Sequence, residues 1–364
     1  MKILFISYFN GQLDSGGGMC SNRNLKSLKT IYGKENVLLY SISRTPKKKN
    51  ESKLLWNLKN ISVDIFEFGF GGLNTFHKKE IVDIINKLKI ATVFIDSSLF
   101  GILSKKIKVQ FPTINVVTFF HNVEYKFFLQ EILKKKNYFL FYRILLAYFS
   151  EKMACKYSNK IISLNQRDKN ELMSLYKRKP DMIIPISMEN SYNKTPSDIT
   201  NDVKIALFVG SYFFPNVQGI KWFLENVMPK TNIRLIVVGK DMDKLKNEIS
   251  QEIDNLEIYS SVPNLTEYYE KADFVVLPIF SGGGMKVKTA EALMFGKFLV
   301  GTTEAFVGYE ISNKVGICCD EEEEMVKIIT NLDNSFKYNE PSKELFLEKY
   351  SFDSTINKFR IVLN

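Results

Sequence analysis

The sequence predicts an α/β protein with two Rossmann-like, doubly wound domains that face each other across a cleft. Its 364 residues exceed what a single hydrophobic core usually supports. Short β-branched or aromatic runs alternate with stretches of helical periodicity, which is typical of βαβ units and parallel sheets. A polar segment without periodicity, residues 187–202, separates two series of such runs. Ligands of such folds meet the carboxyl ends of the strands, so we expect the functional site in the cleft.

The strand candidates define the two halves. In the first half they are residues 2–9, 37–42, 63–68, 92–96, 114–120 and 160–164. In the second half they are residues 204–210, 233–240, 256–262, 273–279 and 298–302. We therefore expect an N-terminal domain over residues 1–195 and a C-terminal domain over residues 203–345. A terminal helix at about 346–364 is expected to pack back on the first domain.

Composition and charge limit the classes of partner. Lys and Arg number 50 against 40 Asp and Glu, a formal charge of +10, which favours anionic partners or simply improves solubility. No nucleic-acid-binding motif is found, so nucleic acid is not an expected partner. The four cysteines show no CxxC spacing, and the amino-terminal apolar run has no cleavage site. We expect a cytoplasmic protein without a membrane-spanning helix, because Arg143 interrupts the longest apolar stretch.

The segment 273–302 contains the most informative motif. A buried strand ends near Pro278, three glycines follow at 282–284, and a helix is expected from about Lys286 to Phe295. Glycines let the backbone approach a ligand, and the first amides of a helix attract anions. Two lysines and a glutamate stand on the same segment, so it could neutralise a diphosphate without a metal ion and bind ribose hydroxyls. The candidate residues are Gly283, Gly284, Lys286, Lys288 and Glu291.

This segment resembles the donor-binding segment of family 4 glycosyltransferases, the large group 1 family with the GT-B fold. The order of strand, Pro, glycines, basic residues, Glu-Ala-Leu, Gly and second strand carries the resemblance. Residues 207–229 are similar to the first strand and helix of the family's C-terminal domain. Residues 260–279 resemble the element that reads the nucleobase. The resemblance covers about residues 204–310 in order, which makes it more specific than a single glycine motif.

The resemblance implies the roles of the donor-site residues. Glu291 would bind the nucleotide ribose, and the glycine loop with a basic residue would bind the diphosphate. Ser211, which follows Gly210 at the end of a strand, would contact the same phosphates. Many members carry an acidic residue where this sequence has Gly283, so their contact to the donor sugar must be absent or replaced here. The Arg and Lys that many members place after the first strand of this domain are also missing, and Lys286 with Lys288 could compensate.

The first half of the chain carries weaker matches of the same kind. Gly16, Gly17 and Gly18 follow the first strand and form an expected loop before a helix; in the resembled family such a loop approaches the reacting centre. The alternative is a loop without a ligand. His121 follows an apolar strand and would contact the donor sugar or stabilise the departing charge, which makes it the candidate catalytic residue. It could instead be a packed strand-end histidine. His77 is interpreted as a surface residue.

The resemblance implies a retaining, hexosyl-type transferase that uses a nucleoside diphosphate sugar as donor substrate and needs no cofactor. No metal is expected, because Asp241 and Asp243 follow a strand where a helix cap is the simpler explanation. The segment 130–152 combines aromatics with the basic run 134–136 and could lie on an anionic membrane, at its inner face, or could simply pack on its domain. A membrane location would favour a lipid-linked acceptor, as in assembly of bacterial surface polysaccharide or glycoconjugate.

Two alternative functions remain open from the sequence. Sugar-nucleotide epimerases share the architecture, but they need acidic and histidine side chains in the cleft, and the chain has only two histidines. A non-catalytic adaptor with a degenerate site is the other alternative, for which Gly283 is the strongest sign. The nucleobase, the sugar, the acceptor and the oligomeric state are not specified by these motifs.

Overall fold

The computed structural model describes residues 1–8, 15–43, 52–67, 69–135, 140–193, 203–249, 253–333 and 337–363. The chain forms two compact units. The first comprises Met1–Pro185 and Thr355–Asn364, and the second comprises Ile186–Ser354. The first unit thus ends before residue 195, where the polar linker suggested the boundary. The reason is that Ile186 donates its amide to Met285 Sδ at 3.4 Å, so the chain joins the second unit directly after Pro185.

The first unit contains a six-stranded parallel sheet in the order β2-β1-β3-β4-β5-β6. Its strands are β1 (Ile3–Ser7), β2 (Val37–Ser41), β3 (Thr92–Ile95), β4 (Asn115–Phe120), β5 (Lys160–Ser163) and β6 (Met182–Ile183). Five of these strands were expected, whereas the two-residue β6 was not. The order reverses direction at β1, as in a doubly wound sheet. The carboxyl ends of β1, β3 and β4 therefore lie next to one another.

The strand expected at 63–68 is wrong, because residues up to Phe66 belong to helix α2. That helix spans Lys53–Phe66, and the Ser52 hydroxyl accepts the amide of Leu55 at 3.1 Å as its N-terminal cap. A short apolar run has the same appearance in a buried strand and at the end of a helix. The N-terminal cap residue Ser52, upstream of the run, identifies it as part of a helix rather than a strand.

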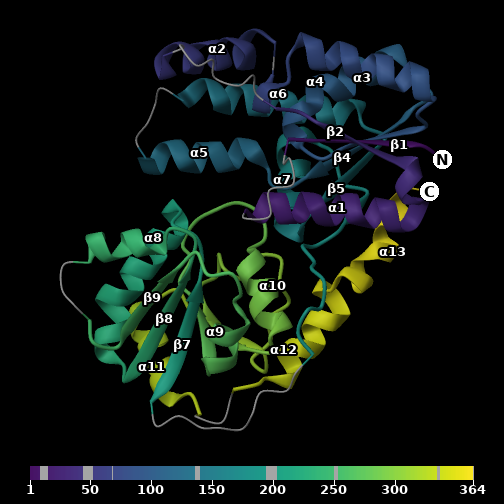
Figure 1. The fold of residues 1–364 in the computed structure, drawn as a ribbon. Coiled ribbons are helices and arrows are strands. Elements are labelled where there is room, and N and C mark those ends of the chain that lie inside the picture. Colours follow the sequence, from purple (N-terminus) through teal and green to yellow (C-terminus); the bar gives the residue numbers. More distant parts are fainter. Residues whose placement is uncertain are drawn as a thin grey trace. The chain divides into compact units, whose positions relative to one another are not determined.

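Helices cover both faces of the first sheet. They are α1 (Gly16–Tyr32), α2, α3 (Thr75–Leu88), α4 (Gly101–Gln110), α5 (Glu124–Lys135), α6 (Phe141–Tyr157), α7 (Gln166–Tyr176) and the end of α13 (Phe352–Leu363). Within this unit α1 and α13 lie on one side of the sheet, and α3 and α4 lie on the other (Figure 1). Alternate strand residues serve the two faces: Phe94 packs on Phe359 of α13, whereas Val93 and Ile95 join the core with α3 and α4.

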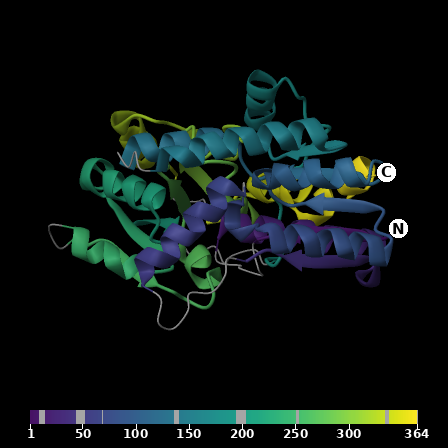
Figure 2. The same cartoon turned by 90° about the horizontal axis from the view of Figure 1, so that it is seen from above.

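Helices α4 and α6 run side by side in both views (Figures 1 and 2). A glycine allows their close approach, because a Cβ atom on Gly101 would lie 1.8 Å from the Ser150 carbonyl oxygen. Glu151, the next residue on α6, is fully buried and accepts the amides of Glu124 at 2.7 Å and Tyr125 at 3.2 Å. Helix α6 thereby supplies hydrogen-bond acceptors for the free backbone amides at the N-terminus of α5. This helix begins shortly after the strand end that carries His121.

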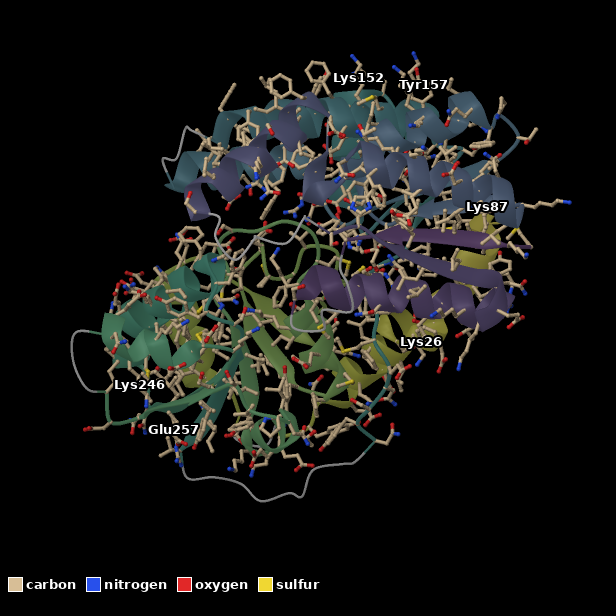
Figure 3. The ribbon with its side chains drawn as sticks, turned by 45° about the horizontal axis from the view of Figure 1, so that its top comes forward. Lys26, Lys87, Lys152, Tyr157, Lys246 and Glu257 are labelled. Carbon is tan, nitrogen blue, oxygen red and sulfur yellow. The ribbon has the colours of Figure 1, made fainter. Side chains whose placement is uncertain are left out.

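The second unit contains another six-stranded parallel sheet, in the order β12-β11-β10-β7-β8-β9 (Figure 1). Its strands are β7 (Lys204–Val209), β8 (Ile233–Gly239), β9 (Leu256–Ser260), β10 (Phe274–Leu277), β11 (Phe298–Gly301) and β12 (Gly316–Cys318). The sequence predicted all of them except the short β12. The carboxyl ends of β7 and β10 are adjacent because these two strands pair directly. Figure 3 labels Glu257, which belongs to β9, and Lys246, which belongs to the short helical segment Met242–Glu248 before it.

The helices of the second unit are α8 (Phe214–Trp222), α9 (Thr266–Lys271), α10 (Val287–Met294), α11 (Glu322–Asn331) and α12 (Glu340–Leu345). Helix α8 packs tightly on the end of β10, since a Cβ atom on Gly219 would lie 1.6 Å from the Pro278 carbonyl oxygen. This packing places the start of α8 next to the glycine turn that follows β10. Among the described residues, no helix is long and apolar enough to cross a membrane.

Candidate active site

The glycine segment forms a turn between β10 and α10, as the sequence predicts. Gly282 has a φ of 132° and Gly284 a φ of 58°, backbone conformations that residues with a Cβ atom rarely adopt. Lys286 occupies the cap position of α10, and the helix itself begins at Val287. The first amides of this helix have no helical acceptor, so the turn presents polar hydrogens and a partial positive charge.

The Lys286 side chain hydrogen-bonds back to the glycine turn. Its Nζ atom lies 3.2 Å from the Gly284 carbonyl oxygen, 3.4 Å from that of Gly283, and 2.7 Å from Glu304 Oε1. Its side chain is 11% exposed and that of Glu304 is 21% exposed. The positive charge of Lys286 is therefore compensated by an acidic side chain from the segment after β11. Sequence reasoning missed Glu304, because an ion pair across 18 residues of chain leaves no local pattern.

Lys288 has different surroundings. Its Nζ atom donates to Asn216 Oδ1 at 2.5 Å and lies 4.7 Å from the centre of the Phe208 ring. A Cβ atom on Gly210 would be 2.8 Å from this nitrogen, so the ammonium group lies against the turn after β7. No ion pair of the described residues includes Lys288. Burial lowers its pKa to about 7, and the positive charge of nearby Lys286 acts in the same direction.

Asn216 connects Lys288 to the turn that carries Ser211. The Asn216 Nδ2 atom donates to the Ser211 carbonyl oxygen at 2.8 Å, while its Oδ1 atom accepts from Lys288. The structure thus brings two predicted site residues together through a third that the sequence analysis missed. The signal was present, since Asn216 lies in the first turn of the helix after the strand, where polar groups face a ligand.

Glu291 lies one turn further along α10. Its Oε2 atom accepts a hydrogen bond from the Tyr269 hydroxyl at 3.1 Å, and Tyr269 stacks on Phe295 with ring centres 4.1 Å apart. Burial raises the pKa of Glu291 to about 7. The carboxyl group is thus held in a fixed position by α9 and can accept hydrogen bonds from hydroxyl groups when it is ionised.

In the first unit, His121 directly follows β4 and contacts Asp96, which directly follows β3. The His121 Nε2 atom is 3.2 Å from Asp96 Oδ1 and 3.1 Å from the Asp96 carbonyl oxygen, so this nitrogen carries a proton. Burial alone would lower the pKa of His121, but the negative charge of Asp96 and the interaction with Cys20 raise it well above the ordinary value. The rule that singled out His121, a polar residue at the carboxyl end of a strand, applies equally to Asp96.

Gly16, Gly17 and Gly18 form the first turn of α1 rather than a loop before it. The Ser15 side chain caps this helix by accepting the Gly18 amide at 3.1 Å, so the helix starts earlier than expected. The cap supplies the hydrogen bond that lets glycines, which are poor helix formers, begin a helix. Residues 9–14, which precede them, lie outside the described residues.

Two other sequence interpretations concern single residues. Asp241 occupies the N-terminal cap position expected from the sequence, with a φ of 61°, but its side chain makes no capping hydrogen bond. Asp243 instead accepts a hydrogen bond from the Ser260 hydroxyl at 2.6 Å.

His77 is half-buried rather than a free surface residue, because its Nδ1 atom lies 2.8 Å from the Tyr40 hydroxyl. In the described part of the chain, no group of three or more His, Cys, Asp or Glu side chains is placed to hold a metal ion.

Comparison with known proteins finds a family model that matches much of the second unit. Residues 203–334 match the family model "Glycosyl transferases group 1". Over 178 residues the chain is 27% identical to an uncharacterized 44.6 kDa protein in the cps region of Klebsiella pneumoniae. That match covers 43% of this chain and 44% of the relative, which is less than half of either protein.

Solved structures share the fold of the whole chain. The apo form of the lipopolysaccharide outer core galactosyltransferase WaaB has a TM-score of 0.69 at 12% identity, covering 100% of this chain and 99% of its own. Anabaena HepE in complex with UDP has a TM-score of 0.69 at 11% identity with the same coverage. A glycosyltransferase from Rickettsia africae has a TM-score of 0.59 at 15% identity, covering 99% and 97%. The match to the group 1 glycosyltransferase model thus lies in the second unit, and the two confirmed Rossmann-like domains give the whole chain the GT-B fold of these structures.

Proposed function

We propose that the protein transfers a hexosyl residue from a nucleoside diphosphate sugar to a hydroxyl acceptor, with retention of configuration. The observation that carries this proposal is the half-buried ammonium group of Lys288. It lies against the turn after β7, hydrogen-bonds only to a neutral amide oxygen among the described residues, and belongs to the first turn of α10. Glu291 interacts electrostatically with Lys288 but forms no ion pair with it, so an arriving anion would further stabilise the ammonium group.

A diphosphate is the anion that fits this position. The first amides of α10 and the Lys288 ammonium provide donors from one side, and the Ser211 turn provides them from the other. Lys286 would add a second positive charge, although Glu304 already compensates it. Glu291 would accept hydrogen bonds from the ribose hydroxyls. No cofactor is proposed, and the two ammonium groups would replace a metal ion in neutralising the leaving group.

His121 would assist at the sugar by stabilising the charge that departs with the nucleotide. Its Nε2 proton is held by Asp96 at 3.2 Å, so the ring is suited to act through its charge rather than as a base. No protein nucleophile is proposed. Nucleotides of the solved relatives support a uridine donor as the first to test, because HepE structures contain UDP and UDP-glucose.

The relatives also suggest the biological setting. WaaB is described as a lipopolysaccharide outer core galactosyltransferase, and the Klebsiella relative lies in a cps region. We infer that the acceptor belongs to a bacterial surface polysaccharide or glycoconjugate. Fold similarity at this level of identity does not select the acceptor.

Helix α6 supports contact of the first unit with an anionic membrane surface. Phe141, Leu145 and Phe149 are 52%, 49% and 48% exposed and lie four residues apart, so they form one apolar stripe. Lys152 and Lys156 continue this stripe and are exposed; Figure 3 shows Lys152 pointing outward from the helix. Aromatic side chains beside lysines are typical of surfaces that bind anionic lipid. The side chains of the basic run 134–136 lie outside the described residues.

The test is binding and turnover with a panel of UDP, GDP and dTDP sugars, using the full chain. We expect calorimetric binding of one nucleotide class, slow donor hydrolysis or transfer, and at least about a hundredfold loss of affinity in the double variant Lys286→Ala/Lys288→Ala. The control is Lys221→Ala, whose side chain pairs with Glu248 on the exposed face of α8. Unchanged affinity in the double variant would contradict the proposal. An altered sugar without nucleotide release would indicate an epimerase instead, and absence of binding would indicate an adaptor.

A further inference from the structure

The segment that follows β11 holds the start of α10 through three contacts. The Glu304 Oε1 atom lies 2.7 Å from the Lys286 Nζ atom. The Ala305 carbonyl oxygen accepts a hydrogen bond from the Thr289 hydroxyl at 2.9 Å. The Tyr309 hydroxyl donates to the Lys286 carbonyl oxygen at 2.6 Å. Two of these contacts are hydrogen bonds between neutral groups, whereas the contact of Glu304 with Lys286 is an ion pair.

The backbone on both sides of Glu304 is fixed. Thr303 donates its amide to Asp320 Oδ1 at 2.8 Å and its hydroxyl to Asp320 Oδ2 at 2.6 Å. Ala305 is fully buried, and its amide donates to the Thr302 carbonyl oxygen at 3.0 Å. Neighbours that are held in this way leave few backbone conformations to the residue between them. Glu304 is therefore kept where its side chain reaches the glycine turn.

The neutral contacts already fix the start of α10. Thr289 is fully buried and Tyr309 is 8% exposed, so water does not compete for their hydrogen bonds. The side chains of Lys286 and Glu304 are 11% and 21% exposed, and an ion pair that water can reach adds little stability. The charge of Glu304 is therefore better explained by an effect on ligand binding than by an effect on folding.

The Lys286 ammonium group lies where the proposed diphosphate would bind. Its Nζ atom is 3.2 Å from the Gly284 carbonyl oxygen and 3.4 Å from that of Gly283. The first amides of α10, which follow directly, have no helical acceptor. A diphosphate bound at these amides would be close to the carboxylate of Glu304 as well as to the ammonium group. Like charges at such distances repel each other, although salt and water screen part of the repulsion.

We propose that Glu304 is an internal counter-anion, which the diphosphate of the donor displaces from Lys286 when it binds. The carboxylate pairs with the ammonium group in the empty site and repels the arriving anion, so it lowers the affinity of the site for a diphosphate. It also favours release of the nucleoside diphosphate after transfer, because it can pair with Lys286 again. This inference rests on the proposed function, since it requires a diphosphate at the glycine turn.

Donor and product differ in charge at this site. When the bond between the sugar and the terminal phosphate oxygen breaks, its electron pair stays on that oxygen. The nucleoside diphosphate therefore carries one more negative charge than the nucleotide sugar. The carboxylate of Glu304 repels the product more strongly than the donor for this reason. Removal of its charge should strengthen product binding more than donor binding.

The test is calorimetric titration of the full chain and of Glu304→Gln with UDP, GDP and dTDP. Glutamine keeps the size of the side chain and an oxygen acceptor for Lys286, but it removes the negative charge. We expect Glu304→Gln to bind about tenfold more tightly whichever nucleoside diphosphate the parent protein binds. Equal or weaker binding by the variant would overturn the role of Glu304.

Two controls separate this role from a general effect of charge. Glu310 is 69% exposed and pairs with Lys349, so Glu310→Gln makes the same change in net charge at a residue whose partner is not part of the glycine turn. It should leave the affinity within about twofold. The matching nucleoside, which has no phosphate, should bind equally to Glu304→Gln and to the parent protein. The same gain in Glu310→Gln, or a gain for the nucleoside, would contradict the proposal.

The difference between product and donor is a readout that a structural role of Glu304 would not change. We expect Glu304→Gln to raise the affinity for the nucleoside diphosphate at least about threefold more than the affinity for the corresponding nucleotide sugar. An equal or larger gain for the nucleotide sugar would contradict the proposal, because a counter-anion acts through charge.

A crystal structure of the parent protein with the nucleoside diphosphate decides if Glu304→Gln does not fold. We expect Lys286 Nζ to contact a phosphate oxygen and to lie more than about 4 Å from Glu304, whereas a retained ion pair would overturn the proposal. Nucleotide binding and sugar transfer with unchanged affinity in Glu304→Gln would refute the role of Glu304 and keep the proposed function. A parent protein that binds no nucleotide and transfers no sugar would refute both.

Discussion

The buried carboxyl group of Glu151 in the first unit and the half-buried ammonium group of Lys288 in the second have opposite surroundings. Glu151 accepts two backbone amides and the hydroxyls of Ser98 at 3.2 Å and Tyr176 at 2.7 Å. Lys288 has one neutral acceptor, Asn216, and an aromatic ring. The protein itself therefore supplies hydrogen-bond donors to the Glu151 carboxyl group. The Lys288 ammonium group has no ionic partner among the described residues and is available to a ligand. Removal of an ionisable group from water does not by itself mark a functional site, but an ionisable group that the protein leaves without compensation does.

The half-buried Lys288 can be compared directly with Lys297, which is buried and whose pKa is likewise lowered by burial to about 7. Lys297 Nζ donates to the carbonyl oxygens of Ala272, at 2.8 Å, and Lys337. We expect Lys288→Ala to weaken binding of the nucleotide sugar by about a hundredfold without lowering the melting temperature. Lys297→Ala should lower the melting temperature and leave the affinity within about twofold. Calorimetry and thermal denaturation measure both, and the reverse pattern would refute the comparison.

The next largest expected effect is the loss of stability when Glu151 is replaced. Replacement by alanine leaves two amides and two hydroxyls without their acceptor and should reduce the free energy of unfolding by about 2–3 kcal/mol. Glu131→Ala is the control, because its contact with Arg143 at 3.9 Å is partly exposed and should contribute less than about 1 kcal/mol. Urea denaturation followed by circular dichroism checks both. Equal losses would show that the hydrogen bonds of Glu151 do not stabilise the unit.

The pH dependence of the same group has a definite sign. Burial raises the pKa of Glu151 to about 8, above the value of about 4.5 in the unfolded chain. The folded protein thus binds more protons between these values, and the contribution of Glu151 to stability decreases as pH rises toward 8. Glu151→Gln should remove this part of the pH dependence. An unchanged slope in the variant would contradict the assignment.

Asn216 should have a smaller effect on the second unit. It holds Lys288 and the Ser211 turn together through two hydrogen bonds, so Asn216→Ala should weaken donor binding by about tenfold while the fold is retained. Asn226→Ala serves as the control, since its amide group donates to the Trp222 carbonyl oxygen within the following helical segment. Calorimetric titration with the nucleotide sugar measures both. Equal affinities in the two variants would mean that Asn216 does not position the lysine.

The smallest expected effect concerns the exposed stripe of α6. Phe149→Glu should reduce binding to vesicles that contain phosphatidylglycerol by about fivefold, because it removes apolar contact and adds a negative charge. Leu347→Glu, at a residue of the second unit that is 45% exposed, is the control. Co-sedimentation measures both variants. Equal binding of Phe149→Glu and the parent protein, or no binding of either, would remove α6 from the membrane proposal.

Local patterns predicted the fold more completely than the site. Ten of the expected strands were found because short apolar runs between glycines and polar turns specify strands well, whereas the run at 63–68 looks the same in a strand and a helix. The rule that ligands bind at the carboxyl ends of parallel strands located His121, Ser211 and the glycine turn. They could not show that Lys286 pairs with Glu304 and that Lys288 has no such partner. That distinction depends on which distant segments pack together, which no spacing along the chain encodes.

Lys288 should lose its proton more easily in the empty site than beside a diphosphate, which would hold it as an ammonium group. Because the pKa of Lys288 in the empty site is about 7, donor binding at about pH 8 should take up close to one proton. Calorimetric titration of the full chain with the nucleotide sugar, repeated in buffers of different ionisation enthalpy, measures this number directly. We predict uptake in the parent protein and none in Lys288→Arg, whose guanidinium group is always protonated. Donor binding without proton uptake in the parent protein would contradict the central claim.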